Sequence, residues 1–223
     1  MRWPSQLGVM VLPNVILFPQ AFLPLFIFEP RYRRMLADSL DSHRLFCVAM
    51  QQPGRRRGTP VQVAGVGLVR ACRQHADGTS HLILQGLARV ELGPASRYRP
   101  YRTHPIRPLN SHLSDTAAAD ALASRLLELV SEQLKEGSPS NPGLAAIATM
   151  EPETLKGLPG GVEFLARVTG PEQISDLVSW ALQTSPGERQ HLLETLDVEA
   201  RLRRLIQLVL TKDDAEESGL PTA

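Results

Sequence analysis

Residues 61–92 read VQVAGVGLVRACRQHADGTSHLILQGLARVEL and contain the clearest local signal in the chain. Asp77-Gly78 separates two apolar runs, and glycine tolerates the positive φ that a two-residue hairpin turn requires. Every second residue from Leu82 to Val90 is apolar or glycine, which is typical of a strand with one buried face. We therefore predict a long β-hairpin, with a β-bulge at Ala64-Gly65 because the apolar parity changes there.

The segments on either side of this hairpin also favour extended structure. Pro30 suits the first position of a helix, whose apolar residues recur at helical spacing as far as Leu40. Several prolines make residues 93–109 an extended edge or connector. Residues 1–110 are therefore predicted to be β-rich with one helix. Apolar runs of strand length occupy Gly8–Leu12, Phe22–Phe28 and Leu45–Met50.

Helical periodicity replaces these short runs after residue 110. Ser114 or Asp115 can cap a helix that runs to Gly137, and Pro171 opens another. Ser185-Pro186-Gly187-Glu188 form a capping box, and Asp197 caps the last helix. The predicted class is α+β. Its parts are a β-rich domain at 1–110, a helical subdomain at 111–210 and an acidic, flexible tail at 211–223.

The charge distribution supports this division into parts. The chain carries a formal net charge of +1, but residues 1–110 hold fifteen Arg, no Lys and five acidic residues, a net +10. Residues 111–223 hold nine basic and eighteen acidic residues, a net −9. Such asymmetry indicates two structural parts and suggests an anionic partner for the basic one.

Several classes of protein are excluded by what the sequence lacks. It contains no phosphate-binding G-x-x-x-x-G-K-[ST] loop, no H-E-x-x-H motif and no G-x-S-x-G elbow, so we expect no cofactor, no metal site and no catalytic residue. Cys47 and Cys72 lie in apolar runs, which favours small buried side chains in a reducing cytoplasm over reactive thiols. No apolar run reaches the roughly 20 residues of a membrane helix, and no signal-peptide cleavage site is evident.

Two arginine-rich stretches form a candidate anion or RNA site. Arg55, Arg56 and Arg57 lie in a glycine-flanked loop, and Arg97 and Arg99 alternate with tyrosines. Guanidinium groups can hold a phosphate while a base stacks on a neighbouring ring, which makes an RNA-binding module the alternative function. Solvated charges on a loop and an edge strand explain the same residues.

Three stretches together resemble the LON N-terminal domain, the substrate-binding domain of the ATP-dependent Lon proteases. They are Leu12-Pro13 followed by Leu17-Phe18-Pro19 and residues 23–32, the hairpin from Gly65 to Val90, and the helices from Ser185 to Leu202. The resemblance implies a PUA-like β pseudo-barrel followed by a helical subdomain, and a role in recognising protein substrates. Neither Lon's ATPase loop nor its Ser–Lys protease motif occurs in the 223 residues, so we expect a free-standing, non-enzymatic domain.

The resemblance also nominates residues for substrate binding. Phe18 and Phe26 belong to the apolar run Leu17–Phe28, which either lines a groove for unfolded segments or forms barrel core. The other candidates are Glu29, Arg31 and Tyr32, at a strand-to-helix junction where a structural role explains them equally. The expected function is a cytoplasmic adaptor that binds unfolded or hydrophobic polypeptide clients or a protein partner, with nucleic acid as the less favoured ligand.

Overall fold

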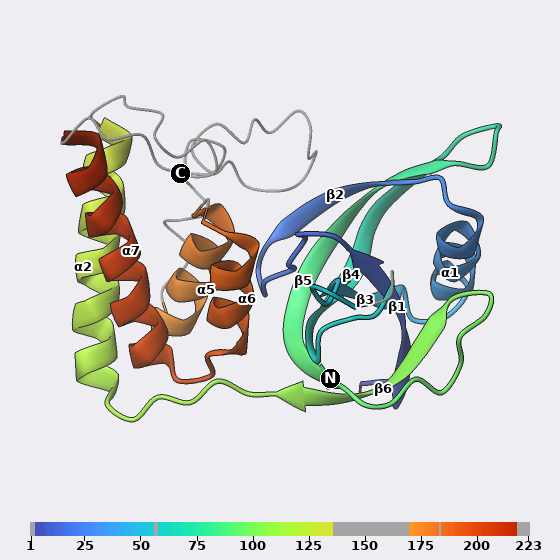
Figure 1. The fold of residues 1–223 in the computed structure, drawn as a ribbon, viewed down its shortest axis with the longest axis horizontal. Helices are drawn as coiled ribbons and strands as arrows, with labels where there is room; N and C mark the ends of the chain where they lie inside the picture. Colours follow the sequence, from blue (N-terminus) through green and yellow to red (C-terminus); the bar gives the residue numbers. More distant parts are fainter. Residues whose placement is uncertain (1–2, 56–57, 136–169, 183, 218–223) are drawn as a thin grey trace. The chain divides into compact units, whose positions relative to one another are not determined.

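The computed structural model describes residues 3–55, 58–135, 170–182 and 184–217, and these divide into two compact units. The β unit comprises Met1–Asn110 and Pro186–Glu194, and the helical unit comprises Ser111–Ser185 and Thr195–Ala223. The elements of both units are labelled in Figure 1. Six strands and several helices confirm the predicted α+β class.

The β unit is built on a six-stranded mixed sheet in the order β2-β5-β4-β3-β1-β6. β5 also pairs with β6, so that β5, β4, β3, β1 and β6 close into a ring and β2 is an additional strand beside the first half of β5. Only the β1–β3 pairing is parallel among those described. The elements are β1 (Gln6–Leu12), β2 (Phe22–Ile27), α1 (Pro30–Leu40), β3 (Leu45–Met50), β4 (Val63–Gln74), β5 (Ser80–Leu92), β6 (Arg102–Leu109) and α6 (Pro186–Glu194).

Apolar side chains from four strands fill the ring. β3 is buried at every position, and alternate residues of β1, β4 and β5 point inward with it. This alternation is the expected consequence of the period of two along a strand. The core cluster consists of Leu7, Val9, Val11, Leu45, Cys47, Ala49, Ala64, Val66, Val90 and Leu92.

The chain before β2 crosses the β4–β5 hairpin at two glycines. A Cβ atom at Gly65 would collide with the Leu17 carbonyl oxygen, and one at Gly86 would collide with the Phe18 carbonyl oxygen. Gly86 also exchanges backbone hydrogen bonds with residues 20–21, at N–O distances of 3.0 and 2.8 Å. Glycine is therefore required at both positions for close approach of another backbone.

The bulge expected at Ala64-Gly65 is wrong in position. Both residues pair in regular register with β5, and the register shifts lie farther along β4, between Val66 and Gly67 and between Val69 and Ala71. Gly65 has a different role, since only glycine at this position admits the crossing backbone.

The hairpin itself is confirmed, but its turn is longer than expected. Gly78 N–H donates to the His75 carbonyl at 2.9 Å and His75 N–H donates to Thr79 O at 2.9 Å, so the turn spans more than two residues. Gly78 has φ +78°, the left-handed conformation that follows a type I turn in this class of hairpin. Asp77 Oδ1 accepts hydrogen bonds from the Thr79 amide and hydroxyl, at 2.9 and 2.7 Å, which stabilises the longer loop.

α6 joins the β unit although its sequence lies within the predicted helical stretch 111–210. The Gln190 side-chain amide donates to the Val63 carbonyl of β4 at 3.0 Å. Buried Arg89 donates from Nε to the Leu193 carbonyl at the end of α6, at 2.9 Å. These long-range hydrogen bonds satisfy buried polar groups and attach α6 to the sheet.

The helical unit contains α2 (Thr116–Lys135), α5 (Pro171–Ala181) and α7 (Val198–Glu217). Its core includes an ion pair between Arg201 Nη2 and Asp176 Oδ1, 3.4 Å apart, with side chains 0% and 2% exposed. Arg201 Nε also donates to Ser175 Oγ at 2.9 Å. α7 continues to Glu217, so the predicted tail at 211–223 begins as helix, and residues 218–223 lie outside the described part of the chain.

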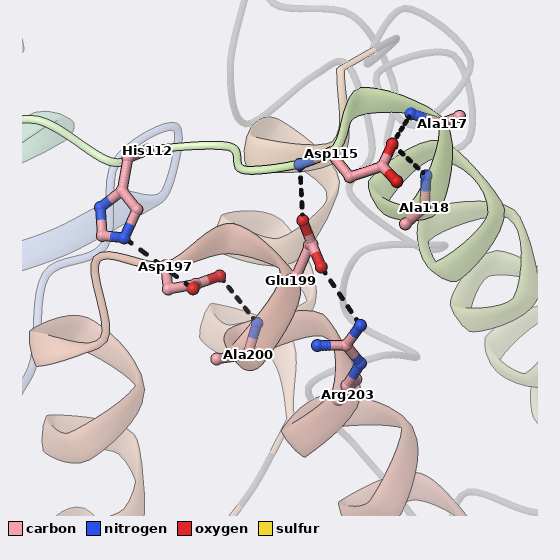
Figure 2. A network of polar contacts seen from close by, with 8 residues as sticks. All are labelled: His112, Asp115, Ala117, Ala118, Asp197, Glu199, Ala200 and Arg203. Carbon is pink, nitrogen blue, oxygen red and sulfur yellow. Dashed lines mark hydrogen bonds and ion pairs between the residues drawn. The ribbon is translucent and has the colours of Figure 1, made fainter.

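The N-termini of α2 and α7 share a polar network, which Figure 2 shows. Asp115 Oδ1 accepts hydrogen bonds from the amides of residues 117 and 118 at 2.9 and 3.2 Å, and Asp197 Oδ1 accepts one from residue 200 at 3.0 Å. Glu199 accepts from the Asp115 amide at 2.8 Å and from Arg203 at 3.1 Å. Asp115 and Asp197 are therefore the predicted helix caps, and Glu199 connects the two helix starts.

No described helix combines the length and the apolarity that are needed to cross a membrane.

The crossing at Gly86 can be tested with Gly86→Ala. We expect the added methyl group to lower the free energy of unfolding by about 3 kcal/mol, because it displaces the Phe18 backbone. Urea denaturation measures the change. Gly187→Ala is the matched control, because nothing lies within 4 Å of a Cβ at that helical position. Equal stability of the two variants would contradict the assigned crossing.

The cap on α2 can be tested with Asp115→Ala and Asp115→Asn. The alanine variant should lose about 1 kcal/mol of unfolding free energy, because two helix amides lose their acceptor, while asparagine keeps it. Thermal and urea denaturation measure the difference. A loss of similar size in both variants would show that the charge, and not the acceptor, stabilises this helix.

Candidate functional site

On the outer face of the sheet formed by β2, β5 and β4, residues align in two rows that run across the three strands. In the β2–β5 register Pro24 lies opposite Ile83 and Phe26 lies opposite His81, and the β4 partners of these two β5 residues are Ala71 and Arg73. Directly opposite residues of paired strands lie on the same face. These six residues are called the outer ribbon face, and they are Pro24, Phe26, Ala71, Arg73, His81 and Ile83.

The outer ribbon face is apolar and open to solvent. Phe26 is 49% exposed and Phe28, the next residue of the same parity, is 59% exposed. Their rings stack with centroids 5.9 Å apart. A hollow of about 500 Å³ lies over the face. Its lining consists of the six residues of the face together with Leu25, Cys72 and Leu82 between them.

Cationic and imidazole groups surround the apolar residues. The His81 ring lies 4.7 Å from the Phe26 ring, and His75 Nε2 is 2.8 Å from His81 Nδ1. Arg73 is exposed on β4. The carboxylate within these three strands is Glu91, which contacts Gln62 and Arg107. With sixteen arginines and seven acidic residues, the β unit as a whole has a net charge of +9.

The apolar run Leu17–Phe28 serves both roles that the sequence left open. Phe18 is 0% exposed, and its carbonyl oxygen lies against Gly86 at the crossing of the hairpin, so it belongs to the core. Phe26, eight residues later, lies on the outer ribbon face. The structure therefore separates these two predicted substrate-binding residues, and only Phe26 is accessible to a ligand.

The residues at the junction of β2 and α1 contact the chain itself. Glu29 accepts hydrogen bonds from Arg31 Nε and Nη2 at 2.9 and 2.8 Å, and the Arg31 guanidinium lies 4.3 Å from the Tyr32 ring centroid. The buried Tyr32 hydroxyl donates to the Val11 carbonyl at 3.0 Å, and burial raises the pKa of Tyr32. Tyr32 therefore links α1 to β1, while Glu29 and Arg31 pair with each other beside its ring.

The arginine–tyrosine stretch also contacts its own residues. Arg97 lies 4.5 Å from the Tyr101 ring centroid, and Arg102 lies 5.0 Å from that of Tyr98. Tyr101 is buried and its hydroxyl donates to Asp38 at 2.8 Å, so its ring does not serve as a platform for a base. Arg55 and Arg99 are exposed, while Arg56 and Arg57 lie outside the described residues.

Cys47 is buried within β3. Burial raises the pKa of the Cys47 thiol well above its usual range, which leaves it protonated and unreactive. Within residues 3–55, 58–135, 170–182 and 184–217, no three His, Cys, Asp or Glu side chains are grouped to hold a metal ion.

Sequence reasoning missed several residues of the outer ribbon face. Pro24, His81 and Ile83 were not nominated, and neither was Phe28 beside them. Alternation along β2 is the sequence signal that points to these residues. Pro24, Phe26 and Phe28 share one parity and so lie on one face. The residues of the other parity, Leu23, Leu25 and Ile27, are equally apolar, so alternation alone does not show which face is exposed.

The described geometry can be compared with known proteins. A family model for the ATP-dependent protease La (LON) substrate-binding domain matches residues 6–211. The sequence is 22% identical over 205 residues to Lon protease from Dictyoglomus thermophilum, covering 91% of this chain and 24% of that protein. It is 26% identical over 222 residues to Lon protease 2 from Myxococcus xanthus, covering 94% of this chain and 24% of that protein.

Solved structures share the fold. The N-terminal domain of Lon protease from the Mycobacterium avium complex matches with a TM-score of 0.66 and 17% identity, covering 92% of this chain and 97% of that one. A Lon N-terminal domain protein from Xanthomonas campestris matches with a TM-score of 0.62 and 18% identity, covering 92% and 98%. The chain spans about a quarter of the length of the curated Lon proteases that it matches.

The inert character of Cys47 can be tested with a thiol reagent in native protein at pH 8. Cys72 is partly exposed and should be modified at least about a hundredfold faster than buried Cys47. Absorbance of the released thiol product measures both rates. Cys72→Ser should remove the fast phase, and denaturation should equalise the two thiols. Fast labelling in the Cys72→Ser variant would contradict the buried assignment.

Proposed function

The chain belongs to the ATP-dependent protease La (LON) substrate-binding domain family, and we propose that it binds polypeptides through the outer ribbon face. The family match confirms the resemblance expected from the sequence. It also supports polypeptides as the class of ligand. The observation that carries the proposal is the pair of stacked, exposed phenylalanines beside an apolar hollow of about 500 Å³.

The chemistry of this face suits unfolded client segments. Exposed clusters of large apolar side chains on one face mark sites of interaction, and burying a phenylalanine contributes about 1.5–3 kcal/mol. Folded proteins bury most of their aromatic side chains, whereas unfolded segments expose them. An open apolar face therefore discriminates unfolded from folded polypeptides without reading a particular sequence.

The proposed role is that of a non-catalytic adaptor. The matched part of the Lon proteases is their substrate-binding domain, and the 223 residues contain no ATPase or Ser–Lys motif. Recognition is thus the activity that this chain's own residues support, with polypeptide clients as partners. Free cysteines at positions 47 and 72 agree with a reducing compartment such as the cytoplasm.

Replacement of both exposed phenylalanines tests the proposed function. We expect Phe26→Ser together with Phe28→Ser to weaken binding of a permanently unfolded, carboxymethylated model protein by at least about tenfold, because buried apolar area is lost. Fluorescence anisotropy with the labelled model protein measures the dissociation constant.

Tyr98→Ser is the matched control for this experiment. Tyr98 is another aromatic residue of the β unit, 63% exposed, but it lies on the stretch between β5 and β6. Its replacement should leave binding unchanged. Unchanged binding by the double phenylalanine variant, or an equal loss with Tyr98→Ser, would count against the outer ribbon face as the binding site.

A further inference from the structure

We propose that the bound polypeptide adds to the sheet as an extra strand along the outer edge of β2. The inference rests on the proposed function, and it specifies how the client is held. β2 is the terminal strand of the sheet, and in the described part of the chain it pairs only with β5. A terminal strand presents backbone donors and acceptors on its outer side, which is a template for another extended chain.

The register shows which backbone groups point outward. Gly86 N–H donates to the Ala21 carbonyl and Phe22 lies opposite Gln85, so Phe22 and Gln85 form a non-hydrogen-bonded pair. Hydrogen-bonded and non-hydrogen-bonded pairs alternate along an antiparallel ladder. The amides of residues 23, 25 and 27 therefore face β5, and the backbone groups of residues 24 and 26 face the outer edge.

Pro24 occupies the position that this alternation predicts for a proline. Because proline has no N–H, it is tolerated in an edge strand where its nitrogen faces away from the ladder. The outer edge then offers the carbonyls of Pro24 and Phe26 as acceptors and the Phe26 amide as donor. The missing donor at Pro24 removes one hydrogen bond with a client but two between identical β2 edges, because each copy lacks it, and this difference favours a client over a second copy.

Charge specifies the chemistry of the occupant. A strand added beside β2 lies on the far side of β2 from β5, so Phe26 is its nearest neighbour in the row formed by Phe26, His81 and Arg73. Arg73, two strands away on β4, gives this face a positive charge, and β2 itself contains no acidic residue. The occupant is therefore an extended segment that presents apolar and acidic side chains in turn on the face it shares with Phe26, because the apolar groups contact the phenylalanines and the carboxylates are attracted by the arginine-rich unit.

The first experiment uses as the probe a blocked octapeptide in which serine separates valine and glutamate in turn, so that valine and glutamate share one face of the extended strand. Its binding to the whole chain is measured by calorimetry at low salt, and an analogue with lysine for glutamate is the charge control. We expect the glutamate probe to bind at least about tenfold more tightly than the lysine analogue. Amide hydrogen exchange of the wild-type chain, followed by NMR, should show the Phe26 amide slowed at least about tenfold by saturating probe, with the loop amide of Gly54 unchanged.

Two variants at one position separate the backbone from the side chain. Phe26→Ala and Phe26→Pro both remove the ring, but only proline also removes the outward amide. We expect Phe26→Pro to bind the probe about fivefold more weakly than Phe26→Ala, because one edge hydrogen bond is lost. If Phe26→Pro does not fold, the hydrogen exchange of the wild-type Phe26 amide decides by itself whether the probe pairs with the β2 edge.

The outcomes distinguish the edge from the face. If the probe binds but the Phe26 amide stays unprotected, strand addition at the β2 edge is overturned. The same holds if the two Phe26 variants bind the probe with equal affinity. Either result leaves the proposed function standing. If the probe does not bind but the carboxymethylated protein does, strand addition is overturned and the proposed function is not. Failure to bind either ligand overturns both proposals. Protection of Phe26 without probe, increasing with protein concentration, would assign the edge to a second copy and overturn the client assignment.

Discussion

The β unit depends on one close approach, where the backbone of residues 17–18 passes over the β4–β5 hairpin at Gly65 and Gly86. The Leu17 and Phe18 carbonyls occupy the space that side chains at those glycines would fill, and Gly86 bonds to residues 20–21 directly after the crossing. This contact sets where β2 begins and which residue of β5 it meets. Phe18, at the crossing, is consequently buried, while Phe26, after it, emerges on the opposite side of the strand from the core.

Much of the local structure could be predicted because its causes lie within a few residues. Pro30 begins α1, Asp115 and Asp197 cap α2 and α7, and the hairpin forms around Asp77-Gly78. The attachment of α6 to the β unit has no such local cause. It depends on hydrogen bonds such as the one between Arg89 and the Leu193 carbonyl, which are 104 residues apart in the sequence.

The candidate site was only partly predictable for a related reason. β2 reads FLPLFI, so both of its faces are apolar and a period of two does not reveal which one faces solvent. Only the register with β5 places Pro24 and Phe26 together with Ile83 and His81. The predicted contacts of Glu29 and Arg31 with a substrate rested on their motif. Their mutual ion pair became visible only once the side chains were placed.

The proposed binding of unfolded polypeptides draws on the outer ribbon face and the β2 edge in complementary ways. Backbone groups are common to every polypeptide, so an edge that bonds to them accepts many sequences. In the proposed complex, apolar contacts with Phe26 and Phe28 stabilise bound hydrophobic segments, and the positive charge of the β unit favours acidic ones among them. Pro24 restrains the same edge from pairing with copies of itself. Under the proposal, a single proline in the terminal strand keeps a surface suited to extended chains available to polypeptide ligands.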